Sequence, residues 1–377
     1  MMQNAAADTQ KLMSIQAIRA VAALFILLIH TAMSINAGGS SYDGWFLIFS
    51  RIGFFGVDIF FVVSGLVMVL TSHQYIGKPG STKKFLIKRI FRIYSSYWIV
   101  LIALFALLST GLLTIWRTDP IVSSSILLAP LPQKQQMLPV AWTLAFEVFF
   151  YLMFALAMLC GKRLFLPFLL TWASIVIICN IFFIDRSQPQ EFVPLYIFFY
   201  LSPLQLEFIG GCLVGLLVKN RYFPLPLKSP WLIVGILLLF ILVNLTSWFS
   251  NWGNWHGEFP RTIFYGTLSV ILVYVAAQLE ITKNLRFPAL LNRIGDASYS
   301  LYLIHPIIIL LSVEHIYTPL LSPLESPLVD NVFIGSLLAT IIIYSLIHYR
   351  FIERPVLRLL TKIITSPKSK KTSSLSS

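Results

Sequence analysis

The first apolar segment of the chain reads IQAIRAVAALFILLIHTAMSI (Ile15–Ile35), is long enough to cross a bilayer, and carries two ionisable side chains. Arg19 and His30 are eleven positions apart, so a helix brings both to one face, roughly 16 Å apart along its axis. Ionisable groups at membrane depth usually face a bundle interior or a polar cavity. The segment therefore predicts a transmembrane helix with one polar face. The alternative is that Arg19 snorkels to the inner headgroups and His30 lies at the outer interface.

The composition is that of a membrane protein. Hydrophobic residues make up 57% of the 377 residues, charged residues make up 11%, and the mean hydropathy is +0.81. The net charge of +13 does not indicate a nucleic-acid partner, because the cations lie in short loops and no DNA-binding or RNA-binding motif is present. Cys160, Cys179 and Cys212 lie in apolar segments without CxxC spacing. We therefore expect neither a disulfide framework nor a metal site.

Ten segments are long and apolar enough to be transmembrane helices, which predicts an all-α polytopic membrane protein. They lie near residues 15–35, 46–70, 93–113, 139–160, 164–184, 194–217, 229–248, 262–279, 297–314 and 331–350. Basic loops such as Lys78–Arg92 alternate with loops poor in cations such as Asp185–Glu191, which places both termini in the cytoplasm. We expect cytoplasmic tails at 1–12 and 357–377, flanking one transmembrane domain at 13–356.

With this orientation, three titratable side chains fall in the outer layer of the membrane. They are His30, Asp58 in the second predicted helix and Glu147, which lies roughly 12 Å below the outer end of the fourth. A carboxylate beside a histidine fixes its tautomer and stabilises the imidazolium, which makes a general base. We predict His30 as that base, oriented by Asp58 or Glu147. Each carboxylate also has a structural interpretation: Asp58 in a helix cap or interhelical bond, and Glu147 in a pair with a loop arginine.

A second group of polar side chains is expected at the cytoplasmic side. Arg19 lies near the inner end of the first helix, and Arg89 and Arg92 are three positions apart on one helix face. His305 lies in the cytoplasmic part of the ninth predicted span, and Glu353 ends the tenth. Forked guanidinium donors suit phosphate groups, although the positive-inside bias alone also fills such loops with cations. Arg19, Arg89, Arg92 and His305 are the predicted binding residues for an anionic cofactor.

Taken together, these segments resemble the acyltransferase-3 family of membrane O-acyltransferases. The matching features are Arg19 and His30 with ten residues between them, FFGVDIFFVVSG (54–65), Arg89-x-x-Arg92, WTLAFEVFFY (142–151), SYSLYLIHP (298–306) and FIERP (351–355). One element alone, such as Arg-x-x-Arg, has little specificity, but all six occur in order across residues 13–356. The sequence ends soon after FIERP and shows no fused hydrolase-like domain, so it resembles the stand-alone, exopolysaccharide-type members.

The resemblance implies an acyl-CoA donor, usually acetyl-CoA, bound from the cytoplasm with the help of Arg89 and Arg92, and an essential His30. It implies an acceptor hydroxyl on lipopolysaccharide, an exopolysaccharide or another lipid-linked glycan. The expected location is the bacterial cytoplasmic (inner) membrane, with membrane lipid and glycan-assembly proteins as further partners. Direct transfer and a transient acyl-histidine are both compatible with these residues.

Two other classes of protein compete with this interpretation. A secondary transporter or flippase also uses intramembrane Arg, His, Asp and Glu, but it predicts internal repeats and broken helices in matching halves, which the sequence does not show. An inert assembly or lipid-binding protein does not account for two separate layers of ionisable groups.

Overall fold

The computed structural model describes residues 12–37, 45–49, 53–113, 122–130, 136–184, 195–220, 229–245, 259–283 and 285–365. Every regular element in these ranges is a helix, which confirms the predicted all-α class. The elements are α1 (Met13–Ala37), η1 (Trp45–Ile48), α3 (Phe55–Ser72), η2 (His73–Tyr75), α4 (Ser81–Ser109), α5 (Val122–Leu127), α6 (Ala141–Leu159), α7 (Gly161–Phe182), α8 (Leu195–Tyr200), α9 (Leu204–Asn220), α10 (Trp231–Leu245), α12 (Phe259–Lys283), α13 (Ala289–Asp296), α14 (Ser298–Ser312), η4 (Val313–Leu321), η5 (Ser322–Leu324), α15 (Pro327–His348), η6 (Tyr349–Glu353) and α16 (Arg354–Thr365).

Eight helical segments in the described part of the chain are long and apolar enough to cross a membrane. The prediction of ten spans differs at two places, because α9 has 17 residues and α10 has 15 in the described ranges. At 1.5 Å per residue these helices are shorter than the hydrocarbon layer, about 30 Å thick. Residues 1–11 and 366–377 lie outside the described residues, so the cytoplasmic location of both termini stays a prediction.

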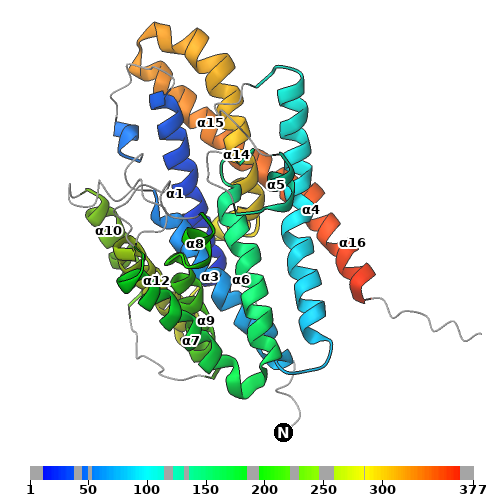
Figure 1. Cartoon of the computed structure of the whole chain (residues 1–377). Coiled ribbons are helices and arrows are strands. Elements are labelled where there is room, and N and C mark those ends of the chain that lie inside the picture. Colours follow the sequence, from blue (N-terminus) through cyan, green and yellow to red (C-terminus); the bar gives the residue numbers. More distant parts are fainter. Residues whose placement is uncertain are drawn as a thin grey trace, which may run out of the picture.

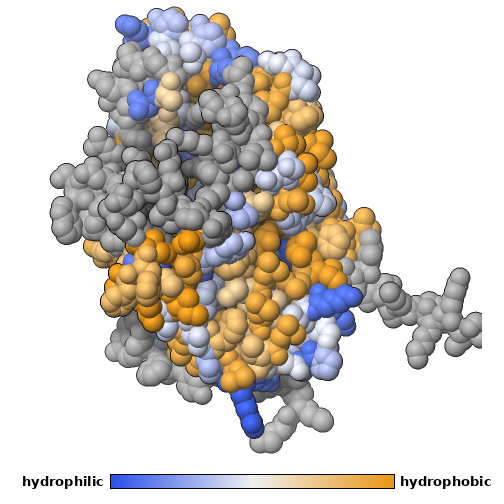
Figure 2. All heavy atoms as spheres, in the orientation of Figure 1, coloured by the Kyte–Doolittle hydropathy of each residue, from blue (hydrophilic) through white to orange (hydrophobic). Residues whose placement is uncertain are grey.

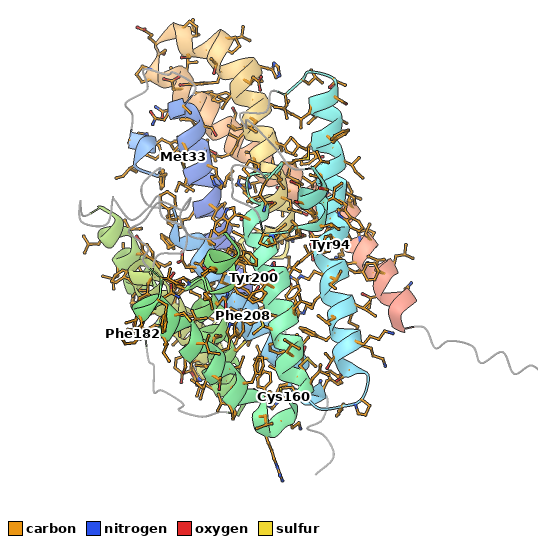
Figure 3. All side chains as sticks on the ribbon, viewed as in Figure 1. Met33, Tyr94, Cys160, Phe182, Tyr200 and Phe208 are labelled. Atoms are coloured by element: carbon orange, nitrogen blue, oxygen red, sulfur yellow. The ribbon has the colours of Figure 1, made fainter. Side chains whose placement is uncertain are left out.

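The outer surface of the bundle is apolar, as a lipid-facing surface requires. Ile102 on α4 is 69% exposed and Phe182 on α7 is 73% exposed, and hydrophobic residues cover much of the face seen in Figure 2. Figure 3 labels Phe182 on this surface and Phe208 inside the bundle, where its ring stacks on Phe150 with centroids 4.5 Å apart. Exposed apolar side chains on this scale mark a protein solvated by lipid.

Glycines allow the central helices to approach closely. A Cβ atom at Gly211 of α9 would lie 1.9 Å from the Val62 carbonyl oxygen of α3, and one at Gly65 would lie 2.1 Å from the Phe208 carbonyl oxygen. Backbone contact between helices needs residues without side chains, which is how helices pack in a bilayer where lipid is as apolar as leucine. The α3–α9 crossing therefore fixes the position of α3.

Helix α1 is central and packs against α3, α12, α13 and α14 (Figure 1). A Cβ atom at Gly295 of α13 would lie 1.9 Å from the Gln16 carbonyl oxygen, so α13 lies directly on the first turns of α1. The N–H groups of Met13 and Ser14 donate to the two carboxylate oxygens of Glu280 on α12, at 2.8 and 2.7 Å. A carboxylate at a helix N-terminus satisfies free donors and complements the helix dipole. These contacts fix the depth of Arg19 and His30.

The segment containing α5 folds back onto α4. Three α4 side chains donate to its backbone carbonyls: Tyr94 to Leu127 at 2.7 Å, Tyr97 to Ser125 at 2.7 Å, and Trp98 to Ile126 at 3.0 Å. The last carbonyls of a helix have no partner within it, and in a membrane protein they need such donors because lipid supplies none. Helix α14 continues through the π-helical segment η4, and α15 runs beside α14 before leading through η6 into α16, which packs along α4 (Figure 1).

Candidate active site

A cavity of about 170 Å³ lies between α1, α3, α4, α6 and α14. Four charged residues line it, Arg19, Arg89, Arg92 and Glu147, together with tyrosine and hydroxyl side chains. We call this site the arginine cavity. Three cations and one carboxylate in a single small cavity have the chemistry that an anionic ligand requires, since ionisable groups inside an apolar bundle are otherwise unfavourable. The structure thus brings together three of the four predicted cofactor-binding residues.

The Arg89 side chain is oriented by three neighbours. Its Nη2 donates to Thr71 Oγ1 at 2.8 Å, and its guanidinium carbon lies 5.7 Å from the ring centroid of Phe85 and 5.8 Å from that of Tyr151. Both aromatic rings attract the cation. A guanidinium has five N–H donors, so Arg89 retains donors for a ligand in the cavity.

Arg19 enters the cavity from α1. Its Nη1 donates to Gln16 Oε1 at 3.2 Å, and its charge interacts with Arg92 and with carboxylates that include Glu353 and Glu147. Arg92 interacts in turn with Glu147 and Glu353. The carboxylates keep two like-charged guanidinium groups close together, while the hydrogen bond of Arg19 goes to a neutral amide.

Glu353 lies in the π-helical turn η6, which aims it into the bundle. Ser300 Oγ donates to Glu353 Oε2 at 2.5 Å, and the same hydroxyl lies 2.9 Å from His348 Nδ1. All three side chains are buried. Single turns of π-helix are frequent at functional sites because they displace one side chain from the regular helical face. Glu353, the glutamate of FIERP, thus interacts through its charge with Arg19 and Arg92 of the arginine cavity.

Glu147 also belongs to the arginine cavity. It accepts hydrogen bonds from Ser64 Oγ at 3.4 Å and from the Tyr151 hydroxyl, and it interacts with the charges of Arg19, Arg89 and Arg92. The sequence-based expectation grouped Glu147 with His30 instead. The difference arises because depth counted from helix ends does not tell which neighbour a side chain faces.

His30 pairs with the other buried histidine of the predicted site. His30 Nδ1 lies 2.8 Å from His305 Nε2, and the two rings meet edge to edge with centroids 5.0 Å apart and planes 11° from parallel. We call these two residues the histidine pair. The prediction that His305 lies in the inner layer, apart from His30, is therefore wrong. Asp58 or Glu147 was the predicted partner of His30, and at Nδ1 the structure places the His305 imidazole instead.

Tyr302 lies between the two sites. It lines the arginine cavity, its hydroxyl lies 2.6 Å from Thr143 Oγ1, and its ring centroid lies 6.0 Å from that of His305. On α14, Tyr302 precedes His305 by three positions, so the two side chains share one helix face. The part of the cavity wall that Tyr302 forms is therefore adjacent to the histidine pair.

Asp58 lies on a different face of α3 from the cavity. It is fully buried in the first turn and shares a helix face with Val62 and Gly65, whose backbones contact α9. The α3 residues that line the cavity include Phe61 and Ser64. The structure therefore places Asp58 towards α9 and outside the cavity lining.

Sequence reasoning missed Thr143, Tyr151 and Tyr302. A spacing signal was present: Thr143, Glu147 and Tyr151 recur every four residues on α6, and Tyr302 precedes His305 by three. Ser64, in the FFGVDIFFVVSG segment, also donates to Glu147. Within the described ranges, no group of three or more His, Cys, Asp and Glu residues is arranged to hold a metal ion.

Comparison with known proteins agrees with a helical bundle embedded in lipid. The family model of the acyltransferase domain of the acyltransferase-3 family matches residues 13–348, so the chain belongs to that family. It is a multi-pass membrane protein and an O-acyltransferase. The chain is similar to the "Exopolysaccharide production protein ExoZ" of Rhizobium meliloti (strain 1021), at 29% identity over 316 residues, which cover 81% of this chain and 90% of that protein. No solved structure matches the chain.

Proposed function

We propose that the protein transfers an acyl group, acetyl in the simplest case, from cytoplasmic acyl-CoA to a hydroxyl of an envelope or extracellular polysaccharide. The observation that carries this proposal is the adjacency of two sites with complementary chemistry. The arginine cavity suits the phosphates of an anionic donor, and the histidine pair lies just beyond Tyr302 at its far wall. Acyl transfer needs both a bound donor and a base at the reacting carbonyl.

The lining of the cavity indicates which part of the donor it takes. The two arginines of α4 share it with apolar side chains such as Val57 and Phe60, so it offers both cations for phosphate and an apolar wall for the pantetheine arm. We assign the CoA phosphates to the mouth of the cavity, at Arg89 and Arg92, and the arm to the interior. Guanidinium groups bind phosphate with two parallel hydrogen bonds, which favours this assignment.

The chemistry follows from the position of His30. One nitrogen of its neutral ring accepts the proton of an acceptor hydroxyl as the oxygen attacks the thioester carbonyl. The new C–O bond forms, the C–S bond breaks, and the CoA thiolate leaves and takes up the proton that His30 holds. This direct transfer needs no covalent enzyme intermediate, and the buried hydroxyl of Ser300 is committed to Glu353 and outside the cavity lining.

The acceptor class comes from the similarity to ExoZ, whose name places it in exopolysaccharide production. We assign this chain to the bacterial cytoplasmic membrane, with a polysaccharide or lipid-linked glycan as acceptor and glycan-assembly proteins as partners. A polymer hydroxyl reaches the histidine pair from the side of the membrane opposite to the CoA nucleotide.

Mass spectrometry of envelope polysaccharides with and without the protein tests this proposal. The expected result is loss of an O-acetyl mass increment when the gene is deleted and its return with the parent sequence. Purified protein with acetyl-CoA labelled in the acetyl group should pass the label to the same glycan. If the glycan retains its acetyl groups and its export falls instead, the protein is a flippase and the proposal is wrong.

A further inference from the structure

The hydrogen bonds of the histidine pair define which nitrogen carries each proton. His305 Nδ1 lies 2.9 Å from the Leu301 carbonyl oxygen, which can only accept a hydrogen bond. This nitrogen therefore carries a proton, and Nε2 of the neutral ring is an acceptor. His30 Nδ1 lies 2.8 Å from that acceptor and must donate to it. The second nitrogen of His30, Nε2, is left unprotonated, which is the state that a general base requires.

The helix around His305 is built to support this chain of hydrogen bonds. Pro306 follows directly, and because proline has no N–H, the Tyr302 carbonyl lacks its usual helical donor. That carbonyl also interacts with the His305 ring. His305 is fully buried, and the ring of Tyr302 lies beside it. The imidazole is thus held by backbone dipoles from its own helix.

We propose that His305 is a positioning residue that selects the His30 tautomer with a free Nε2 and stabilises the charge that forms when this atom takes a proton. This inference rests on the proposed function, because it assigns His30 the role of base. Histidine here takes the part that a carboxylate plays in many hydrolases. When His30 becomes positive, its Nδ1–H bond to His305 strengthens, and the Leu301 carbonyl dipole stabilises the charge through the second ring.

This arrangement suits a base inside an apolar bundle. A histidine pair is neutral before the reaction and carries one charge only while the proton is held. A carboxylate in the same place would carry a permanent charge, with the desolvation penalty that such a group has at membrane depth. The hydrogen bond between the two ring nitrogens joins the pair without any ion pair.

Two amide substitutions of His305 test the proposal, because glutamine imitates Nε2 of the ring and asparagine imitates Nδ1. In His305→Gln the side-chain oxygen reaches about as far as Nε2 and accepts from His30. In His305→Asn the amide is shorter, so it bonds to Leu301 but does not reach His30. We expect kcat within about tenfold of the parent for His305→Gln and a loss of about 100-fold or more for His305→Asn, with the KM for acyl-CoA unchanged in both.

The two variants also control for folding, because both place a buried amide at the same position. Membrane abundance and melting temperature should match between them. Equal turnover of His305→Gln and His305→Asn, at equal abundance, would overturn the proposal, since a merely structural role does not distinguish an amide that reaches His30 from one that does not. A rise in the KM for acyl-CoA with kcat unchanged would move His305 to the donor site and equally overturn it.

A measurement without turnover separates this inference from the proposed function. The chain has six histidines, so solid-state NMR of ¹⁵N-histidine protein in lipid bilayers can be assigned by comparison with His30→Gln. We expect one protonated and one unprotonated nitrogen in each ring, with a coupling from His30 Nδ1–H to His305 Nε2. Finding this pattern in a protein without acyl transfer would refute only the function. Finding His30 protonated at Nε2 would refute the positioning role even if acyl transfer occurs.

Discussion

The arginine cavity and the histidine pair are adjacent, yet they are built on opposite principles. The cavity holds charges from three helices and balances them with carboxylates, with the rings of Phe85 and Tyr151 beside Arg89, and with a π-helical turn that aims Glu353. The histidine pair is uncharged as the hydrogen bonds define it, and it consists of two rings and a backbone carbonyl. The arginine cavity, proposed to bind a permanently anionic ligand, holds permanent charge. The histidine pair, proposed to carry a charge only while it holds a proton, is neutral between reactions.

The largest expected effect comes from removing the base of the histidine pair. His30→Ala should lower turnover by about 10²–10⁴-fold, the range that general-base catalysis supplies, while leaving acyl-CoA affinity near that of the parent. Acetyl transfer to the glycan is measured together with membrane abundance. His315→Ala, at an exposed histidine on η4, is the control. Substantial transfer by His30→Ala at normal abundance would remove His30 from the mechanism.

The next effect tests the other region. Arg89→Gln with Arg92→Gln should weaken acyl-CoA binding, by about 1.5–3 kcal/mol for each charge-assisted hydrogen bond lost, with little change in acceptor selectivity. Calorimetry with CoA in detergent measures the affinity. Lys83→Gln with Lys84→Gln removes two exposed charges from the same helix and controls for the general field of the inner surface. Unchanged CoA affinity in the arginine variant would show that Arg89 and Arg92 only orient the helix in the membrane and do not bind the donor.

Glu147 discriminates directly between the two regions. Because it bonds to Ser64 and Tyr151 inside the arginine cavity, Glu147→Gln should change the KM for acyl-CoA by about tenfold or less and should leave kcat nearly unchanged. Steady-state kinetics at saturating glycan measures both. Glu325→Gln, an exposed glutamate after η5, is the matched control. A strong fall in kcat with normal KM would instead assign Glu147 to the reacting hydroxyl.

The smallest effect on chemistry is expected at Asp58. Since it lies on the α9 side of α3, Asp58→Asn should change turnover per folded molecule by less than about threefold, while lowering stability by an amount typical of a buried polar change. Asp330→Asn is a close control, because Asp330 is also a buried acid in the first turn of its helix. The measurement is single-turnover acetyl transfer, normalised to the amount of folded protein. A 100-fold fall for Asp58→Asn would contradict this prediction and make Asp58 the partner of His30.

The sequence predicted the helical class and the set of arginines because both depend on local signals. Apolar length reveals a span, and Arg89-x-x-Arg92 shares a face in any helix. The sequence could not show that Glu147 lies in the arginine cavity and that His305 lies beside His30. Both depend on how α1, α6 and α14 are rotated against one another. That rotation is determined by backbone contacts, such as Gly295 on Gln16, between segments far apart in the chain. Which residues belong to a transmembrane span was predictable from apolar length, whereas the depth and direction of Glu147 and His305 within their spans were not.

The cap on α1 has a consequence for how the protein is made. Glu280 accepts from Met13 and Ser14 across 267 and 266 positions of sequence. At a synthesis rate of about 5–20 residues per second, the carboxylate emerges on the order of 10–50 s after the helix it caps. During that interval the nascent α1 resides in the membrane with its first donors turned to water or headgroups, and Arg19 and His30 have not yet met their partners from α14 and η6. The proposed reaction centre is therefore assembled late in biogenesis, when the last third of the chain joins the first helix.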